Sequence, residues 1–204
     1  MKLRGLYALT PELADSKTLL RQVAQALDGG IAMLQYRSKG RQRIDEAKFL
    51  VRMCRERTVP FIVNDDVELA LACGADGVHL GRDDGDQEVA RTKLKGKILG
   101  VSCYNSLSAA RTAAAAGADY IAFGSVFPSP TKPGAVRAPL SLFGEARALG
   151  VPLVAIGGIT LHNAPQLLGA GADALAVISD LFEAADIAGR ARAYGKLFQH
   201  DLAQ

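Results

Sequence analysis

Three polar side chains spaced by two follow an apolar run in the first quarter of the chain. Gln35, Arg37 and Lys39 come directly after the apolar segment 31–34. In extended backbone, residues two apart project to the same side, so these side chains are expected to converge, and one amide with two cations suits an anionic ligand. A solvated loop is the alternative for Arg37 and Lys39. Gln35 weighs against that alternative, because a polar residue ending an apolar run is unexpected unless it faces a site.

A second group of candidates is acidic. Asp65 and Asp84 each follow an apolar run. If those runs are neighbouring strands, the two carboxylates can approach each other. They would then suit Mg2+, which usually takes one or two carboxylates and completes its shell with water and substrate phosphates. Asp83 remains an alternative to Asp84 as the second ligand. Asp66 is more simply interpreted as an acid in the first turn of a helix, where the helix dipole favours it.

Glycines and a serine in the last quarter of the chain suit a phosphate. Gly157 and Gly158 follow one apolar run, and Ser179 follows the next. In a barrel, the loops after the seventh and eighth strands commonly hold a phosphate. Glycine lets backbone N–H groups approach closely, and the N-terminus of a short following helix adds further donors.

No catalytic triad accompanies these candidates. His79 lies inside an apolar run, where a core or supporting position is expected, while His162 belongs to a helical segment and His200 to the C-terminal tail. Neither a Ser-His-Asp nor a Cys-His arrangement can be assembled, which argues against acyl transfer. The candidates together indicate metal-assisted chemistry on a phosphorylated substrate.

The elements that must position these residues alternate regularly. Short apolar runs rich in β-branched residues recur, each followed by an amphipathic segment, which predicts parallel strands joined by crossover helices. The predicted strands are 6–9, 31–36, 61–63, 77–80, 98–101, 120–123, 153–156 and 174–178. Eight such units close into a (β/α)8 barrel or open into a doubly wound sheet. The first predicted strand lacks a GxGxxG turn, and polar or glycine residues follow most strands, so we expect the barrel.

The tripeptide Gly-Ala-Asp recurs before three of the predicted strands, with its aspartates at Asp76, Asp119 and Asp173. The glycine can take the left-handed conformation that ends a helix, and Ala-Asp makes the turn into the strand. The repeat predicts helix-to-strand turns rather than catalytic carboxylates, because it falls at the opposite ends of the strands from the expected site.

Length, composition and charge indicate how many domains to expect and which kinds of partner and location are disfavoured. The chain has 204 residues, 49% hydrophobic and 22% charged, with a net charge of +3. We expect a single domain over residues 1–204, an α/β TIM barrel of near-minimal length. The small, scattered charge gives no reason to expect nucleic acid or a membrane surface. The uncharged segment 148–172 is broken by glycine and proline, which argues against a membrane span. Three cysteines without a CxxC spacing suit a cytoplasmic location.

Seven motifs in register make the chain resemble the thiamine phosphate synthase family over its whole length. They are Gln35-Tyr36-Arg37-x-Lys39, Val63-Asn64-Asp65-Asp66, Gly74-Ala75-Asp76-Gly77-Val78-His79-Leu80-Gly81, Gly100-Val101-Ser102, Phe123-Gly124-Ser125-Val126-Phe127, Thr131-Lys132-Pro133 and Ala155-Ile156-Gly157-Gly158-Ile159. The resemblance implies a transferase that joins 4-amino-2-methyl-5-(diphosphooxymethyl)pyrimidine to 4-methyl-5-(2-phosphooxyethyl)thiazole. The products would be thiamine phosphate and diphosphate.

The resemblance also implies roles for individual residues. Contacts to the pyrimidine diphosphate would come from Gln35, Arg37, Lys39, Asn64, Ser102 and Lys132, with Arg37, Lys39, Ser102 and Lys132 as the catalytic set. The thiazole phosphate would be bound by Ser129, Thr131, Gly158, Ile178 and Ser179. Asp65 and Asp84 would hold one Mg2+ per subunit. The partners expected are these two small molecules, and the resemblance leaves room for a homodimer.

In the implied mechanism, diphosphate leaves first and the electron-rich aminopyrimidine stabilises the resulting carbocation. The thiazole nitrogen then attacks with its own lone pair, which explains why no general base is found. Two departures from the family pattern leave points open. Pro130 stiffens the loop beside Ser129, and Arg82 stands where glutamine is common, beside the expected metal.

Two other functions compete with this reading. A thiazole tautomerase, a related barrel, would need a base near the thiazole and no residues for a diphosphate. A non-catalytic phosphate-binding barrel would keep Gly157-Gly158 and lose the paired aspartates. The retained cations and carboxylates favour the synthase over both.

Overall fold

The computed structural model describes residues 2–12, 15–37, 43–81, 84–128, 134 and 136–200. These residues form eight parallel strands that close into one barrel, in which each strand pairs with the next and β8 pairs with β1. The strands are β1 (Gly5–Leu9), β2 (Met33–Tyr36), β3 (Phe61–Asn64), β4 (Gly77–Leu80), β5 (Ile98–Tyr104), β6 (Tyr120–Gly124), β7 (Leu153–Ile156) and β8 (Ala174–Val177). The expected (β/α)8 barrel is confirmed, and the open sheet is excluded.

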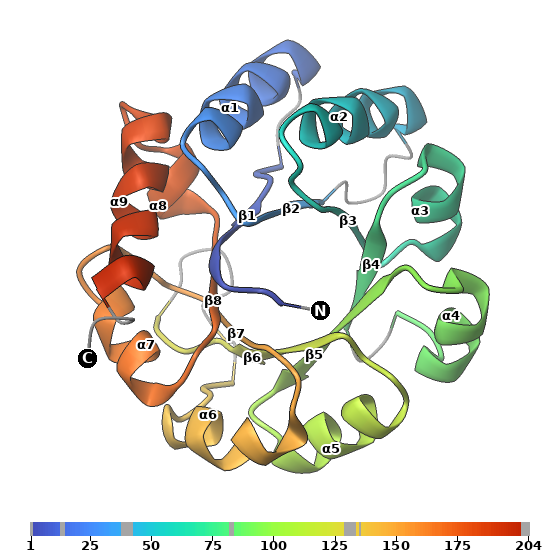
Figure 1. The fold of residues 1–204 in the computed structure, drawn as a ribbon, viewed down its shortest axis with the longest axis vertical. Coiled ribbons are helices and arrows are strands. Elements are labelled where there is room, and N and C mark those ends of the chain that lie inside the picture. Colours follow the sequence, from blue (N-terminus) through green and yellow to red (C-terminus); the bar gives the residue numbers. More distant parts are fainter. Residues whose placement is uncertain are drawn as a thin grey trace.

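Helices form a ring outside the strands (Figure 1). They are α1 (Ser16–Asp28), α2 (Ile44–Glu56), α3 (Val67–Cys73), α4 (Gln87–Leu94), α5 (Leu107–Ala115), α6 (Ser141–Ala146), α7 (Ala164–Ala170), α8 (Ser179–Phe182) and α9 (Ile187–His200), with the 3-10 helix η1 (Arg147–Leu149) after α6. The last unit therefore carries two helices. The short α8 starts at the barrel mouth, and the long α9 packs against α1 and β1.

Four predicted strands have a different C-terminal end in the structure: β3 and β6 are one residue longer, and the changes at β5 and β8 affect candidate residues. The β5 strand continues past Val101 to Tyr104, because its pairing with β6 shifts register between Ser102 and Tyr104. Such an irregularity lets a strand bend while it stays paired. At β8 the strand stops at Val177, and Ile178 becomes the residue that precedes α8. Ser102 thus lies within a strand, and Ile178 lies in a loop.

Two apolar layers stabilise the barrel. Side chains alternate along each strand, so one set points into the lumen and the other toward the helices. The lumen holds a compact cluster that includes Tyr7, Met33, Ile62, Tyr120 and Val154. The larger cluster lies between the strands and the helices. Side chains therefore fill the lumen toward the N-terminal ends of the strands. The lumen is open at the C-terminal ends of the strands, which form the barrel mouth.

The Gly-Ala-Asp repeats are the turns that the sequence predicts. Asp76 Oδ2 accepts a hydrogen bond from Phe61 N at 2.8 Å, so the carboxylate fixes the first residue of the preceding strand. Asp119 and Asp173 bind Leu99 N and Leu153 N in the same way, at 2.8 and 2.9 Å. All three carboxylates lie at the strand starts, away from the mouth, and their structural role is confirmed.

Within the described ranges, no helix is long and apolar enough to cross a bilayer.

Candidate active site

A cavity of about 780 Å³ opens at the carboxyl ends of the strands. Its walls include residues from all eight strands and from the loops that follow them, among them Leu9, Gln35, Asn64, Ser102 and Ile156. A volume of that order accommodates small-molecule ligands. In a TIM barrel this end of the strands is where active sites form.

Nine of the thirteen predicted site residues line this one cavity. They are Gln35, Arg37, Asn64, Asp65, Asp84, Ser102, Gly158, Ile178 and Ser179. The other four, Lys39, Ser129, Thr131 and Lys132, lie outside the described residues, as do Arg82, Asp83 and Pro130. The structure therefore brings the described candidates together, and their individual roles stay predictions.

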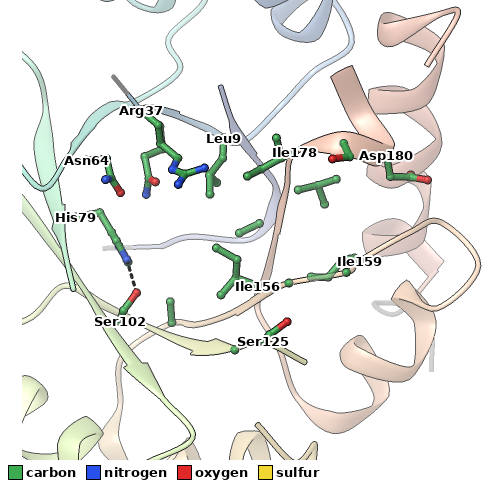
Figure 2. Close-up of a pocket in the computed structure, with 18 of the residues that line it drawn as sticks. Leu9, Arg37, Asn64, His79, Ser102, Ser125, Ile156, Ile159, Ile178 and Asp180 are labelled. Atoms are coloured by element: carbon green, nitrogen blue, oxygen red, sulfur yellow. Dashed lines mark hydrogen bonds between the residues drawn. The ribbon is translucent and has the colours of Figure 1, made fainter. Parts of the chain in front are cut away.

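The cavity has a polar side and an apolar side. Figure 2 shows Arg37, Asn64, His79 and Ser102 on one side, contributed by β2 to β5 and the loops that follow them. Across the cavity stand Ile156, Ile159 and Ile178, from the β7 and β8 ends, with Asp180 at the rim beside them. A ligand with one charged, polar half and one apolar half would match this division.

Arg37 is held at the mouth through its backbone. Its N–H donates to Thr10 Oγ1 at 2.9 Å, and Thr10 is fully buried at the end of β1. This hydrogen bond holds the backbone of Arg37, the first residue after β2, against the end of β1. The position from which the guanidinium side chain extends is therefore fixed. The sequence reading missed Thr10, although its place directly after the first predicted strand was a usable signal.

Asp65 occupies a constrained turn after β3. Its φ is +65°, in the left-handed region that aspartate and asparagine tolerate better than most residues. Its N–H donates to the His79 carbonyl at 2.8 Å, and its Oδ2 accepts from Asn64 Nδ2. The backbone and the neighbouring amide therefore orient this carboxylate beside the cavity.

Asp84 holds the loop after β4 and also lines the cavity. One oxygen, Oδ2, accepts from Gly81 N at 2.7 Å. Asp65 and Asp84 together provide hard carboxylate oxygens on the polar side of the cavity, a donor set that fits Mg2+. In the part of the chain that the structure describes, no three His, Cys, Asp or Glu side chains cluster. One or two carboxylates are what Mg2+ usually takes from a protein when substrate phosphates and water supply the remaining ligands.

His79 is buried beneath the polar side. Its Nε2 lies 2.8 Å from Ser102 Oγ (Figure 2) and its Nδ1 lies 2.9 Å from Tyr120 OH. Burial lowers the pKa of His79 to about 4, opposed by the charge of Asp84 and assisted by that of Arg37. The imidazole is therefore neutral near pH 7 and carries a single proton. His79 is buried within β4, as expected for a residue inside an apolar run, and it also lines the cavity.

Gly158 shapes the opposite side. Its φ is +63°, and a Cβ at this position would clash with the carbonyl of Pro128 and the backbone of Phe127. Only glycine lets the loop after β7 pass so close to the loop after β6. Asn163 Nδ2 donates to the Gly158 carbonyl at 2.9 Å, which fixes the peptide in place.

The rim after β8 contains polar residues that the sequence reading did not identify. Asp180, Glu183 and Arg190 all line the cavity. Arg190 donates to Asp180 at 2.8 Å, and Tyr194 OH donates to the other oxygen of the same carboxylate at 2.8 Å. Arg190 comes from α9 rather than from a strand end, so an inventory of residues after strands could not find it.

Comparisons with known proteins agree with this geometry. Residues 6–181 match a family model described as thiamine monophosphate synthase. The chain is 59% identical over 202 residues to the thiamine-phosphate synthase of Aromatoleum aromaticum, covering 97% of each chain. It is 57% identical to the protein of the same name from Azoarcus sp., covering 97% of this chain and 98% of the relative.

A solved structure supports the same grouping. The thiamine phosphate pyrophosphorylase from Pyrococcus furiosus superposes with a TM-score of 0.86 at 36% identity, and 98% of each chain is covered. Fold and sequence similarity therefore extend over nearly the whole chain.

Proposed function

Because the chain belongs to the thiamine monophosphate synthase family, it is a transferase of thiamine biosynthesis, and we propose that the cavity is where it joins the two halves of thiamine phosphate. The substrates are 4-amino-2-methyl-5-(diphosphooxymethyl)pyrimidine and 4-methyl-5-(2-phosphooxyethyl)thiazole. One observation carries the proposal. Cationic, amide and carboxylate groups on one side of the cavity face three isoleucines and a glycine loop on the other, an arrangement that suits two phosphorylated heterocycles of different polarity.

The polar side would take the pyrimidine diphosphate. Gln35, Asn64 and Ser102 offer hydrogen-bonding groups to the ring, and Arg37 offers a guanidinium to the phosphates. Family resemblance adds Lys39 and Lys132, which lie outside the described residues. The cations would surround the leaving group, where negative charge develops during the reaction.

The apolar side would take the thiazole phosphate. Ile178 offers a surface for the ring, and the loops at Gly158 and Ser179 offer backbone N–H groups for the phosphate. Family resemblance adds Ser129 and Thr131 to this subsite. The thiazole nitrogen would then lie between the apolar wall and the pyrimidine.

The reaction needs no base from the protein. The bond between the pyrimidine methylene carbon and the diphosphate oxygen breaks, and both electrons leave with the diphosphate. The thiazole nitrogen uses its lone pair to form the new bond to that carbon, and no proton is removed from it. His79 suits this chemistry, because it is neutral and both of its nitrogens are engaged in hydrogen bonds.

Asp65 and Asp84 would hold Mg2+ on the polar side, where the ion neutralises charge on the diphosphate when bound. The protein's part is to orient these carboxylates. The turn at Asp65 and the hydrogen bond from Gly81 to Asp84 provide that orientation.

Removal of divalent ions tests this proposal. We expect a chelator to lower product formation by about a hundredfold or more, and added Mg2+ to restore it. Asp84→Asn should raise the Mg2+ concentration needed for half-maximal rate, because it removes a charged ligand. The rate is followed by diphosphate release, with circular dichroism as the check that the chelated protein stays folded. An undiminished rate in chelator would refute the metal assignment.

The proposal also includes a cellular location and an oligomeric state. The cysteines Cys54, Cys73 and Cys103 are buried free thiols, which suits a cytoplasmic location. A homodimer is consistent with the exposed apolar side chains Phe49 and Leu71 on the adjacent helices α2 and α3.

A further inference from the structure

A continuous chain of hydrogen bonds crosses the barrel lumen beneath the cavity. It runs from Gln35 through Tyr7, Tyr120 and His79 to Ser102. The successive distances are 2.8 Å from Gln35 Nε2 to Tyr7 OH, 2.7 Å between the tyrosine hydroxyls, 2.9 Å from Tyr120 OH to His79 Nδ1 and 2.8 Å from His79 Nε2 to Ser102 Oγ. The two end residues line the cavity, and the two tyrosines are completely enclosed below it.

The packing around Tyr120 shows that the chain is built into the fold. Tyr120 lies opposite Gly100 in the β5–β6 register, and a Cβ at Gly100 would clash with the tyrosine ring. The ring stacks on His79 at 5.6 Å between centroids and meets Tyr7 edge-on at 5.8 Å. A residue without a side chain on one strand thus makes room for the central hydroxyl of the chain.

With Gln35 Nε2 as the first donor, the hydrogen bonds of the chain follow one direction. Gln35 Nε2 donates to Tyr7 OH, and the only acceptor for the Tyr7 proton among the described residues is Tyr120 OH. Tyr120 OH then donates its own hydrogen bond to His79 Nδ1. To accept this hydrogen bond, Nδ1 must carry no proton. An imidazole whose Nδ1 accepts a hydrogen bond carries its proton on Nε2, so the contact of Nε2 with Ser102 Oγ at 2.8 Å is one in which Nε2–H donates.

This direction determines what each end presents to a ligand. Gln35 uses its amide nitrogen inside the chain, which leaves its carbonyl oxygen as the group for the cavity. Ser102 Oγ accepts a hydrogen bond from His79 Nε2–H, so its own hydroxyl proton is left to donate to a ligand. Within the described ranges Ser102 makes no other side-chain hydrogen bond. The polar side of the cavity therefore presents one acceptor and one donor.

We propose that Tyr7, Tyr120 and His79 are positioning residues that fix Gln35 as an acceptor and Ser102 as a donor, so that the cavity selects an aminopyrimidine over its oxo counterpart. The inference rests on the proposed function, since it assumes that the pyrimidine meets these two side chains. An aminopyrimidine donates through its amino group and accepts through an unprotonated ring nitrogen. The oxo analogue sets a carbonyl acceptor where the amino donor was, and it would face the Gln35 oxygen. Buried polar groups left unpaired in this way discriminate strongly between ligands.

The first test uses the free protein, without substrates. In 15N-labelled protein, the ring nitrogens of a histidine report which one carries the proton, and the chain has three histidines, of which His79 is assigned by its loss in His79→Gln. We expect the Nε2–H tautomer at pH 7. The Nδ1–H tautomer would reverse every hydrogen bond in the chain and would overturn the inference.

The second test measures selectivity. Tyr120→Phe keeps the ring and removes the central hydroxyl, so we expect the ratio of kcat/KM for the amino over the oxo pyrimidine diphosphate to fall by about tenfold or more. Tyr36→Phe is the matched control. That tyrosine is also completely enclosed but donates to Glu46 at 2.5 Å, in the layer between strands and helices. The control should keep the wild-type ratio, and thermal unfolding checks that both variants are folded.

A further pair of variants tests the hydrogen-bond chain, and one outcome distinguishes failure of this inference from failure of the proposed function. His79→Gln, which can still accept and donate, should retain more of the selectivity than His79→Leu, and equal loss in both would count against the directed chain. An unchanged ratio in Tyr120→Phe would also overturn it. If the Nε2–H tautomer is found but wild-type protein makes no product from either pyrimidine, the proposed function fails while the directed chain stands.

Discussion

Asp65→Ala is expected to lower kcat by about two to three orders of magnitude with saturating substrates and Mg2+, while the barrel stays folded. The carboxylate lines the polar side of the cavity and is oriented by its turn and by Asn64. In the proposed site, its loss would remove a charged Mg2+ ligand from the place where the diphosphate would accumulate charge. The measurement is the steady-state rate of diphosphate release.

Asp65→Asn separates charge from backbone strain. Alanine is strained at a φ of +65°, whereas asparagine tolerates that region and keeps the size of the side chain. We expect the asparagine variant to lose nearly as much activity and less stability than the alanine variant. Asp76→Asn is the matched control, because Asp76 lies at the opposite ends of the strands and an amide oxygen can still accept from Phe61 N. Near-normal turnover in Asp65→Asn would contradict the assignment.

Arg37→Ala is expected to lower kcat by about a hundredfold, with a smaller loss in Arg37→Lys. The guanidinium would neutralise charge on the departing diphosphate, and lysine keeps the charge without the paired N–H donors. Thr10 anchors the Arg37 backbone in every variant, so the change is confined to the side chain. The same assay of diphosphate release measures the effect.

Arg57→Ala provides the control for a lost cation. Arg57 pairs with Asp28 at 3.0 Å on the outside of the barrel, and a surface pair of this kind contributes little to stability. We expect wild-type turnover from this variant. If Arg37→Ala also keeps wild-type turnover, the guanidinium has no part in the reaction.

The barrel could be predicted from the sequence because its signal is local and repeated. Eight apolar runs, each with a helix-forming segment after it, are visible without any knowledge of contacts, and the Gly-Ala-Asp turns mark where helices end. The extension of β5 to Tyr104 could not be predicted in the same way. It depends on a register shift against β6, which is a property of two paired strands rather than of one segment.

For the candidate site too, residues with a local sequence signal could be predicted, and residues that meet only through tertiary contacts could not. Residues that directly follow strands, such as Arg37 and Asp65, were predictable because all strand ends of a barrel meet at one mouth. The lumen chain was not, since Tyr7 and Tyr120 are 113 residues apart and their hydroxyls meet only after the barrel closes. Arg190 reaches the cavity from a helix, which no rule about strand ends anticipates.

The central claim is that this cavity condenses an aminopyrimidine diphosphate with a thiazole phosphate, and 31P NMR of a complete reaction tests it most directly. Purified protein, both substrates and Mg2+ should yield thiamine phosphate and diphosphate in equal amounts, with neither formed when one substrate is omitted. Failure to form thiamine phosphate from both substrates, or rearrangement of the thiazole phosphate without consumption of the pyrimidine, would contradict the claim.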